Sequence, residues 1–447
     1  MAYSPATISD PRTRADARTL ADDLLAFLNA SPVNAFAVAE MEHTLREVGF
    51  TELSEARPFE LRHGLPYYVK RHDTALIAFV VGDLSPAEAG FRIVGAHTDS
   101  PGFKIKPNPE RVSQGLVHLG VEVYGGPLIA TWTDRDLGLA GRVFLLGEDG
   151  RVETRLYRSS HGLLSLPNLA IHQNREANDG GLKLNPQTEL RVVLGSVSDG
   201  LPEEGALRWL LAQALDVDTE RILDYDLFLY DTQAPSYSGV SQEFIHSGRL
   251  DDLAMCHAAV TALAETAAAN SSWTRVVACF DAEEVGSRTP QGAQSWFLPS
   301  VLERIGASLG DDREGHYRAL AQSSLVSADN AHGIHPGYPG KAEPDHAPVL
   351  NGGPVIKSHA GGAYATDGYG AALFERAAKR VSVPVQRFVN RSDVRSGGTI
   401  GSMVATQLGI LAVDVGNPQY AMHSVREMAG TWDHWYMTRT LQSFMTR

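Results

Sequence analysis

An apolar run that ends abruptly in acidic residues constrains this chain more than any other feature. Residues 276–280, VVACF, are β-branched or apolar, which is typical of a buried strand. Asp281, Glu283 and Glu284 follow directly. Neighbouring side chains of a strand point to opposite faces, so Glu283 and Glu284 reach one site only if the strand has ended and the chain turns at 285–287. Buried carboxylates there must be paired or bind a metal, whereas a solvated acidic loop is the simpler alternative.

A second apolar run ends in the same way. Residues 91–96 form a strand-like segment that leads into His97 and Asp99. In open α/β sheets the ligand site lies beyond the carboxyl ends of the strands. Two such strand ends in one chain therefore favour an α/β fold with a site at one edge of its sheet.

Length and charge narrow the class of protein. The chain has 447 residues, so we expect two domains. A net charge of −14 argues against nucleic acid and anionic membranes as partners. Cys256 and Cys279 are too few and too far apart for a zinc ribbon and suit buried thiols in a reducing compartment. With no signal peptide or membrane span in sight, we expect a cytoplasmic protein.

The order of patterns along the chain suggests an insertion. After a loose tail to about residue 14, helical spacing covers 16–30 and 34–48, and strand-like runs follow. Short alternating runs then dominate from about 104 to 226, and helices return at 206–215 and 250–269. We therefore expect a first catalytic part at 1–107, an inserted β-rich domain at 108–228 and a second catalytic part at 229–447. The Gly-rich segment 352–370 predicts a loop close to a ligand.

Several common enzyme motifs are absent. The sequence has no H-E-x-x-H and no Walker A loop, and no G-x-G-x-x-G follows a strand. Residues 306–310, GASLG, match G-x-S-x-G, but they do not follow a strand-like run as a nucleophile elbow requires. Zincin, serine-hydrolase, nucleotide-binding and dehydrogenase functions lose their usual support.

A scattered set of acids and histidines remains. Each member has an ordinary explanation on its own, such as a helix cap for Asp251 or a turn for Asp329. Together they meet the demand of two divalent metals that share a bridging carboxylate. The set is His97, Asp251, Glu284, Asp329 and His423, with Glu283 left as a base and Asp99 placed to orient His97. Spacing alone does not choose between Asp251 and Asp252.

Five motifs in this set resemble the aspartyl aminopeptidase family, a group of two-zinc, tetrahedrally assembled metallopeptidases. They are GAHTDSPG at 95–102, GRLDDL at 248–253, DAEEVGS at 281–287, SADNAH at 327–332 and MHSVRE at 422–427. The resemblance implies a discontinuous α/β catalytic domain with a central mixed sheet flanked by helices. An inserted β-rich domain for assembly interrupts it, and dimers pair into a homododecamer.

The resemblance also assigns roles to the metal-site residues. His97 and Asp329 would ligate one zinc, Glu284 and His423 the other, and Asp251 would bridge the two zinc ions. Glu283 matches the general base and Asp99 a catalytic residue. Mn²⁺ and Co²⁺ share these ligand types, so the sequence does not fix the metal.

Substrate contacts follow from the same resemblance. His172, in the inserted domain, matches a histidine lent to the active site of a neighbouring subunit. His332, Lys357 and Tyr364 match the substrate pocket. The chain departs from the family between Lys357 and Tyr364, where a Gln-Arg pair is replaced by residues 362–363, Gly-Ala.

The sequence thus predicts a metallo-aminopeptidase that removes N-terminal residues, with a preference for Asp or Glu. Metal would polarise the scissile carbonyl and lower the pKa of a bridging water, and Glu283 would take the proton and deliver it to the leaving amine. A two-metal amidohydrolase for a non-peptide amide is one alternative. A non-catalytic assembly protein is another, although the intact ligand set argues against it.

Overall fold

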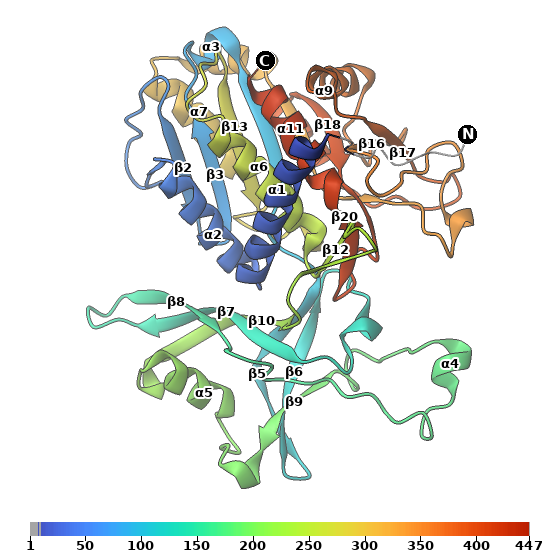
Figure 1. Cartoon of the computed structure of the whole chain (residues 1–447). Helices are drawn as coiled ribbons and strands as arrows, with labels where there is room; N and C mark the ends of the chain where they lie inside the picture. The colour runs from blue at the N-terminus through green and yellow to red at the C-terminus, as the bar shows by residue number, and fades with distance from the viewer. Residues whose placement is uncertain (1–7, 9, 447) are drawn as a thin grey trace.

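The computed structural model describes residues 8 and 10–446, which form two bodies (Figure 1). The larger body is built on a nine-stranded sheet of order β1-β2-β3-β13-β4-β14-β18-β16-β17, and the smaller on a six-stranded sheet of order β8-β7-β10-β5-β6-β9. A five-stranded sheet, β11-β12-β20-β19-β15, lies at the side of the larger body that faces the smaller one.

The bounds of the strands are as follows. The nine-stranded sheet comprises β1 (Thr51–Glu52), β2 (Pro66–Arg71), β3 (Ala75–Val80), β4 (Phe91–His97), β13 (Thr274–Phe280), β14 (Ser324–Ala328), β16 (Val355–Ser358), β17 (Gln386–Val389) and β18 (Leu411–Gly416). The six-stranded sheet comprises β5 (Gly102–Ser113), β6 (Leu116–Tyr124), β7 (Leu137–Leu146), β8 (Val152–Arg158), β9 (Arg191–Ser196) and β10 (Ile222–Asp231). The third sheet comprises β11 (Ser236–Ser238), β12 (Phe244–Ser247), β15 (Ala331–His332), β19 (Pro418–Tyr420) and β20 (Glu427–Gly430).

Helices cover both faces of the nine-stranded sheet, because its central strands are apolar on both sides. One face packs on α1 (Pro11–Ala30), α2 (Asn34–Glu47), α6 (Leu250–Glu265), α9 (Gly368–Arg380) and α11 (Thr431–Thr446). The other packs on α7 (Phe297–Ser308), α8 (Arg313–Ala321) and α10 (Ile400–Leu408). The shorter helices are α3 (Pro86–Ala89), α4 (Glu176–Gly180) and α5 (Ala206–Leu215). The mixed α/β sheet with flanking helices confirms the predicted fold class.

The central strands of the nine-stranded sheet end side by side. Strands β13, β4 and β14 are neighbours and run parallel, with Phe280 opposite His97 and Ser327 opposite Gly95. Their carboxyl ends therefore meet at one edge, as the two sequence runs that end in polar residues predict.

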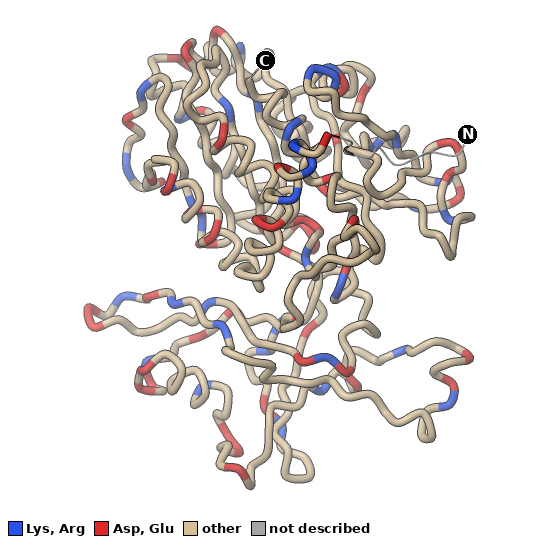
Figure 2. Tube along the Cα trace, in the orientation of Figure 1, with Lys and Arg blue, Asp and Glu red and all other residues tan. Residues whose placement is uncertain are grey.

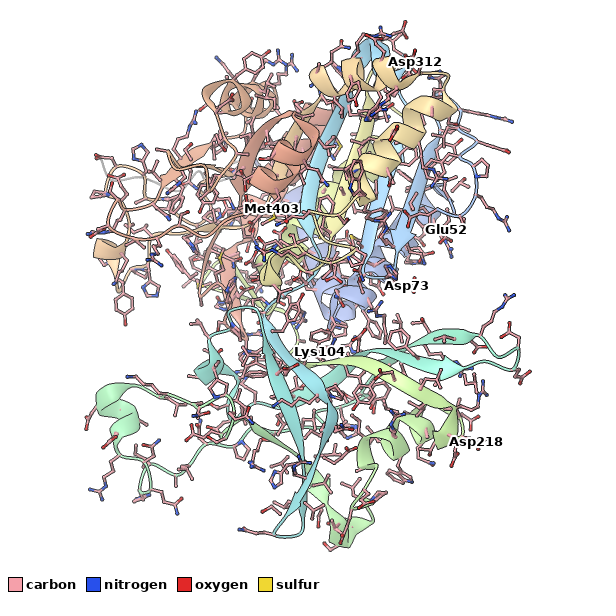
Figure 3. The ribbon with its side chains drawn as sticks, turned by 180° about the vertical axis from the view of Figure 1, so that it is seen from behind. Glu52, Asp73, Lys104, Asp218, Asp312 and Met403 are labelled. Atoms are coloured by element: carbon pink, nitrogen blue, oxygen red, sulfur yellow. The ribbon has the colours of Figure 1, made fainter. Side chains whose placement is uncertain are left out.

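The smaller body leaves the larger one at this same edge. β5 and β6 form a hairpin whose turn residues, Gln114 and Gly115, both have positive φ, so the turn suits a two-residue hairpin. In the view from behind, Lys104 of β5 lies where the two bodies meet, Asp218 lies on the smaller body and Asp312 at the far end of the larger one (Figure 3). The smaller sheet runs from Gly102 to Asp231, so the predicted boundaries after residues 107 and 228 fall inside β5 and β10.

Three local predictions need correction. The tail predicted to reach about residue 14 is shorter, because Pro11 begins α1. The side chain of Asp10 caps this helix by accepting a hydrogen bond from Thr13 N at 2.8 Å. Residues 1–7 and 9 lie outside the described part. The helix predicted over 250–269 ends at Glu265. The Gly-rich segment 352–370 is not all loop, because it contains β16 and the start of α9.

Two buried histidines and an exposed aspartate link three helices. His257 Nε2 on α6 lies 3.1 Å from Asp23 Oδ2 on α1, and His257 Nδ1 lies 2.9 Å from His434 Nε2 on α11. Burial, together with neighbouring His257, lowers the pKa of His434 well below its ordinary value.

Charged residues of both signs are mixed along the chain. Figure 2 shows Lys and Arg interspersed with Asp and Glu along both bodies. Within residues 8 and 10–446, no helix combines the length and apolar character needed to cross a bilayer.

Candidate metal centre

His97 is held so that one ring nitrogen faces the site. Its Nδ1 lies 3.0 Å from the main-chain oxygen of Asp99 and 3.4 Å from Asp99 Oδ1, so Nδ1 carries the proton. Nε2 is then free to donate its lone pair, and it faces Asp251 Oδ1 at 3.7 Å. Asp99 thus contacts the imidazole that the sequence predicts it to orient, and its role in the reaction stays a prediction.

His423, from the turn between β19 and β20, repeats this arrangement. Its Nδ1 donates to the main-chain oxygen of Gly126 at 3.1 Å. Its Nε2 lies 3.3 Å from Asp251 Oδ2 and 3.3 Å from Glu284 Oε1. The two imidazoles thus face the two oxygens of one carboxylate, which is the geometry that a bridging ligand requires.

The turn after β13 brings both glutamates into the site. Residues 283–285 form a single 3₁₀ turn between two residues with positive φ, Ala282 and Gly286. Asp99 holds this turn: its Oδ1 accepts from Glu283 N at 3.0 Å and its Oδ2 from Glu284 N at 3.1 Å. Glu283 and Glu284 both lie within reach of His97.

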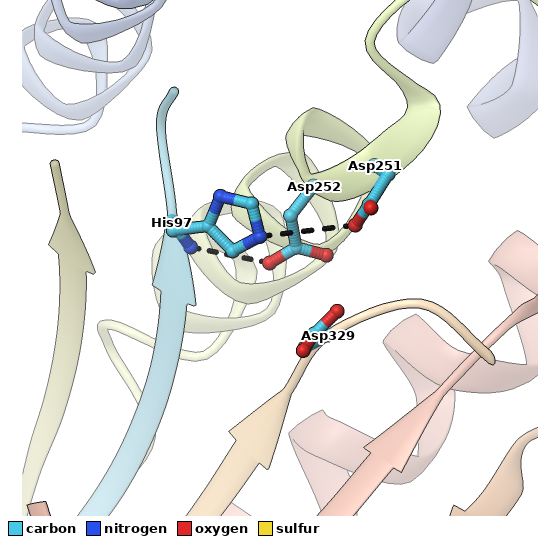
Figure 4. Close-up of side chains that lie close together, drawn as sticks. All are labelled: His97, Asp251, Asp252 and Asp329. Carbon is cyan, nitrogen blue, oxygen red and sulfur yellow. Dashed lines mark hydrogen bonds and ion pairs between the residues drawn. The ribbon is translucent and has the colours of Figure 1, made fainter. Parts of the chain in front are cut away.

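Asp329 and the Asp251-Asp252 pair complete the acidic wall. Figure 4 shows His97 at the end of its strand, with the carboxylates of Asp251, Asp252 and Asp329 gathered around it. Asp252 Oδ2 accepts from His97 N at 3.1 Å, so this side chain supports the backbone of a candidate ligand. Lys357 Nζ lies 3.4 Å from Asp329 Oδ2.

Glu427 fixes two other members of the site from behind. It is buried, its Oε2 accepts from Asp251 N at 3.1 Å, and its Oε1 accepts from His423 N at 2.8 Å. Burial raises the pKa of Glu427 to about 8. The sequence motif contains this residue but assigns it no role, because a buried acceptor for two backbone N–H groups leaves no mark in spacing.

The donor set fits divalent metal ions. Asp251 Oδ1 and Asp252 Oδ1 are buried with no hydrogen-bond partner among the described residues, and two imidazole Nε2 atoms point at the same place. Burial raises the pKa of Glu283 to about 8 and raises that of Asp329. So many buried carboxylates are unfavourable together unless cations neutralise them. The imidazole and carboxylate set suits zinc.

The candidate substrate residues lie beside this centre. Lys357 is on β16 rather than in a loop, is buried, and donates to Asn330 O at 3.2 Å. Its Nζ lies 5.3 Å from the ring centre of Tyr364. Tyr364 and His332 line a cavity of about 260 Å³.

His172 is the one predicted site residue that a single chain does not bring in. It is exposed and lies just before α4, in a segment that stands out from the smaller body (Figure 1). Two large apolar side chains beside it are also exposed, Leu169 by 65% and Ile171 by 45%.

The sequence alone missed Tyr124, which donates its hydroxyl hydrogen to Asp99 Oδ2 at 2.8 Å. The available signal was weak: an aromatic residue at a strand end, followed by the flexible pair Gly125-Gly126.

Comparison with known families identifies the family of the chain that carries this candidate centre. Residues 27–445 match the family model described as aminopeptidase I zinc metalloprotease (M18). The chain belongs to the M18 family of aminopeptidases. It is therefore a zinc metallo-aminopeptidase, and the match confirms the resemblance noted in the sequence.

Relatives of this M18 chain cover nearly its whole length. It is 46% identical over 426 residues to "Probable M18 family aminopeptidase 2" of Clostridium acetobutylicum, an alignment that covers 95% of this chain and 98% of that one. A protein of the same name from Azotobacter vinelandii is 45% identical and covers 94% and 96%.

Solved structures show the same fold. A chain of the cryo-EM structure of the Ape4 and Nbr1 complex has a TM-score of 0.93 and 37% identity, over 98% of this chain and 87% of that one. The crystal structure of prApe1 has a TM-score of 0.91 and 29% identity, over 96% and 95%. The S. cerevisiae mApe1 dodecamer has a TM-score of 0.83 and 27% identity, over 96% and 97%.

Proposed function

We propose that this M18 aminopeptidase removes the N-terminal residue of peptides, preferring Asp or Glu, at a site that holds two divalent metals. The observation that carries the proposal is the placement of Asp251 between two imidazoles. His97 Nε2 faces one of its oxygens and His423 Nε2 faces the other. Asp329 then joins the His97 side and Glu284 the His423 side.

The chain's own groups supply the remaining chemistry. Two bound zinc ions would provide Lewis acidity, which polarises a scissile carbonyl and lowers the pKa of a water. Glu283 is next to the ligands, and Asp99 holds its backbone N–H. A raised pKa suits this carboxyl to take a proton from water and pass it to the leaving amine.

The acidic preference rests on Lys357. Its buried ammonium lies between Asp329 and the ring of Tyr364, beside the cavity that Tyr364 and His332 line. A substrate carboxylate that enters from this cavity would gain a charge-assisted contact, worth about 1.5–3 kcal/mol. The contact with Asp329 gives Lys357 a second task, which is to hold that candidate ligand in place.

We also propose that the chain works as a homo-oligomer, in which dimers build a dodecamer. The exposed side chains Leu169 and Ile171 flank His172 and would gain from burial against a second copy. His172 would then reach the active site of the neighbour. The structurally similar mApe1 is a dodecamer. In this proposal residues 108–228 serve assembly, and residues 1–107 and 229–447 serve catalysis.

The test combines metal content with turnover. Purified protein should hold two zinc ions per subunit and hydrolyse an N-terminal Asp peptide faster than a Leu or Lys peptide, and a chelator should abolish the activity. Glu283→Gln should keep its metals and lose most turnover, whereas Glu284→Gln should also lose metal affinity.

Each failure has a distinct meaning. If Glu283→Gln loses metal and Glu284→Gln keeps it, the two roles are exchanged. Turnover of a non-peptide amide without peptide hydrolysis would favour an amidohydrolase. Bound zinc without any turnover would favour a non-catalytic assembly protein.

A further inference from the structure

The β5–β6 hairpin of the smaller sheet has both of its open ends at the metal centre. β5 begins at Gly102, shortly after Asp99, and β6 returns so that Tyr124 pairs with Gly102. The turn at Gln114-Gly115 is at the other end of the hairpin. The inserted sheet is therefore anchored where the candidate ligands lie.

Tyr124 is the first contact of this hairpin end with the site. Its hydroxyl donates to Asp99 Oδ2 at 2.8 Å, and Asp99 accepts the backbone N–H groups of Glu283 and Glu284. Phe228 of β10 holds the Tyr124 ring edge-on, with ring centres 5.4 Å apart. Burial raises the pKa of Tyr124, which keeps its hydroxyl a donor.

Gly125 makes the second contact, with Glu284, and a larger side chain would not fit between the two residues. A Cβ on Gly125 would lie 3.0 Å from Glu284 Cβ and 3.3 Å from Glu284 O. The backbone of Gly125 thus forms the wall against which Glu284 rests.

Gly126 and Leu128 make the third contact, with His423. Gly126 O accepts the Nδ1 proton of His423 at 3.1 Å, and Leu128 N donates to His423 O at 2.9 Å. The first of these bonds selects the tautomer of His423 that leaves Nε2 free for a metal.

We propose that the end of β6 and the residues after it, 124–128, position Glu284 and His423 within the same subunit. The inserted sheet would then complete one of the two metal sites in cis, in addition to any part it has in assembly. This inference rests on the proposed two-metal function.

The proposal predicts an asymmetry between the two metals. His97 is held by Asp99 and Asp252 and Asp329 by Lys357, and all three of these supporting residues belong to the larger body. Glu284 and His423 touch the backbone of residues 125–128. Disturbing that backbone should therefore weaken one metal much more than the other.

Two glycines that flank β6 give a matched pair of variants. Gly125 and Gly115 both have positive φ, +65° and +79°, so alanine strains the backbone at either position. A Cβ at Gly115 meets nothing within 4 Å, whereas one at Gly125 meets Glu284. Gly115→Ala therefore controls for strain alone.

The experiment measures metal retained per subunit during titration with a competing chelator. Wild type and Gly115→Ala should lose their two zinc ions alike. Gly125→Ala should lose one zinc ion at a chelator concentration about 10–100-fold lower than wild type and keep the other. Mutation of a group that supports a metal ligand typically lowers metal affinity by that factor. Its kcat, measured at saturating zinc, should fall more than its KM rises.

A second pair covers the case in which Gly125→Ala does not fold. Tyr124→Phe removes the hydroxyl that Asp99 accepts. Tyr225→Phe removes a hydroxyl of the same sheet that donates to main-chain oxygens of residues 106 and 107, away from the metal centre. Only Tyr124→Phe should lower zinc retention and kcat.

The outcomes separate this inference from the proposed function. If wild type binds two zinc ions and cleaves peptides, but Gly125→Ala behaves as Gly115→Ala, the positioning role is wrong. Equal loss of both zinc ions from Gly125→Ala overturns it too. If wild type does not bind two metals, the proposed function fails first, and the inference fails with it.

Discussion

Replacing Asp99 by asparagine is a sharp test of how the turn that carries Glu283 and Glu284 is held. Asp99 Oδ1 accepts from Glu283 N, and Oδ2 accepts from both Glu284 N and Tyr124. Asparagine has nearly the same shape but offers one oxygen and one NH₂ group. If its oxygen takes the Oδ2 position, it still accepts from Glu284 N and from the Tyr124 hydroxyl. Its NH₂ group then faces the N–H of Glu283, so two donors meet and the N–H of Glu283 loses its acceptor.

The size of the effect follows from that mismatch. A buried donor left without an acceptor costs about 1–3 kcal/mol. If this cost destabilises the transition state relative to free enzyme and substrate, kcat/KM drops about 5–150-fold, because every 1.4 kcal/mol is a factor of ten. The bonds that remain lose the charge assistance of the carboxylate, which works in the same direction.

Steady-state kinetics at saturating zinc measures this loss apart from metal affinity. Asp433→Asn is a matched control, because Asp433 is also buried and also accepts two backbone N–H groups, from Asn351 and Gly353, at the start of α11. It should lower the unfolding temperature and leave kcat/KM unchanged. A kcat/KM for Asp99→Asn within twofold of wild type would refute the reasoning.

Three further predictions concern specificity, assembly and stability. Lys357→Met should reduce turnover of acidic substrates far more than of neutral ones; an equal loss, measured over a panel of aminoacyl substrates, would make Lys357 purely structural. His172→Ala should keep its metals and assembly but lose about 10²–10³ in turnover, and mixing it with Glu283→Gln subunits should restore activity unless His172 acts within its own subunit. For His434, burial lowers the native pKa below the unfolded value near 6.5, so its contribution to stability is present above about pH 6.5 and is lost as the pH falls, at up to about 1.4 kcal/mol per pH unit. Denaturant unfolding should therefore show a weaker loss of stability between pH 6.5 and 5.5 for His434→Gln than for wild type, and identical slopes would contradict this account.

The sequence predicted where β4 and β13 end, because the end of a strand depends on only a few neighbouring residues. An apolar run must stop where the chain leaves the core, so the polar residues after β4 and β13 marked the edge of the sheet at which the candidate metal ligands gather. The turn at Glu283 and Glu284 was predictable for the same reason, since neighbouring residues share a site only off a strand.

Contacts between distant segments were not predictable in this way. Asp251 and Asp252 are equivalent by spacing; the family resemblance favoured Asp251, and in the structure both His97 Nε2 and His423 Nε2 face Asp251. Lys357 was expected in a loop close to a ligand because the segment is rich in glycine, yet β16 pairs with β17 and β18 and the side chain of Lys357 is buried. The division into residues 1–107, 108–228 and 229–447 and the location in the cell stay predictions.

The spread of the metal-centre residues along the chain has a consequence for biosynthesis. His97 is made early, but His423 is added only after most of the chain, and both must face Asp251. Long-range contacts of this kind form late in folding. A nascent or prematurely terminated chain would lack one imidazole and the Glu427 acceptor that holds it. We therefore expect a chain that stops before His423 to have no peptidase activity, and peptide cleavage to begin only once the C-terminal segment has folded onto the site.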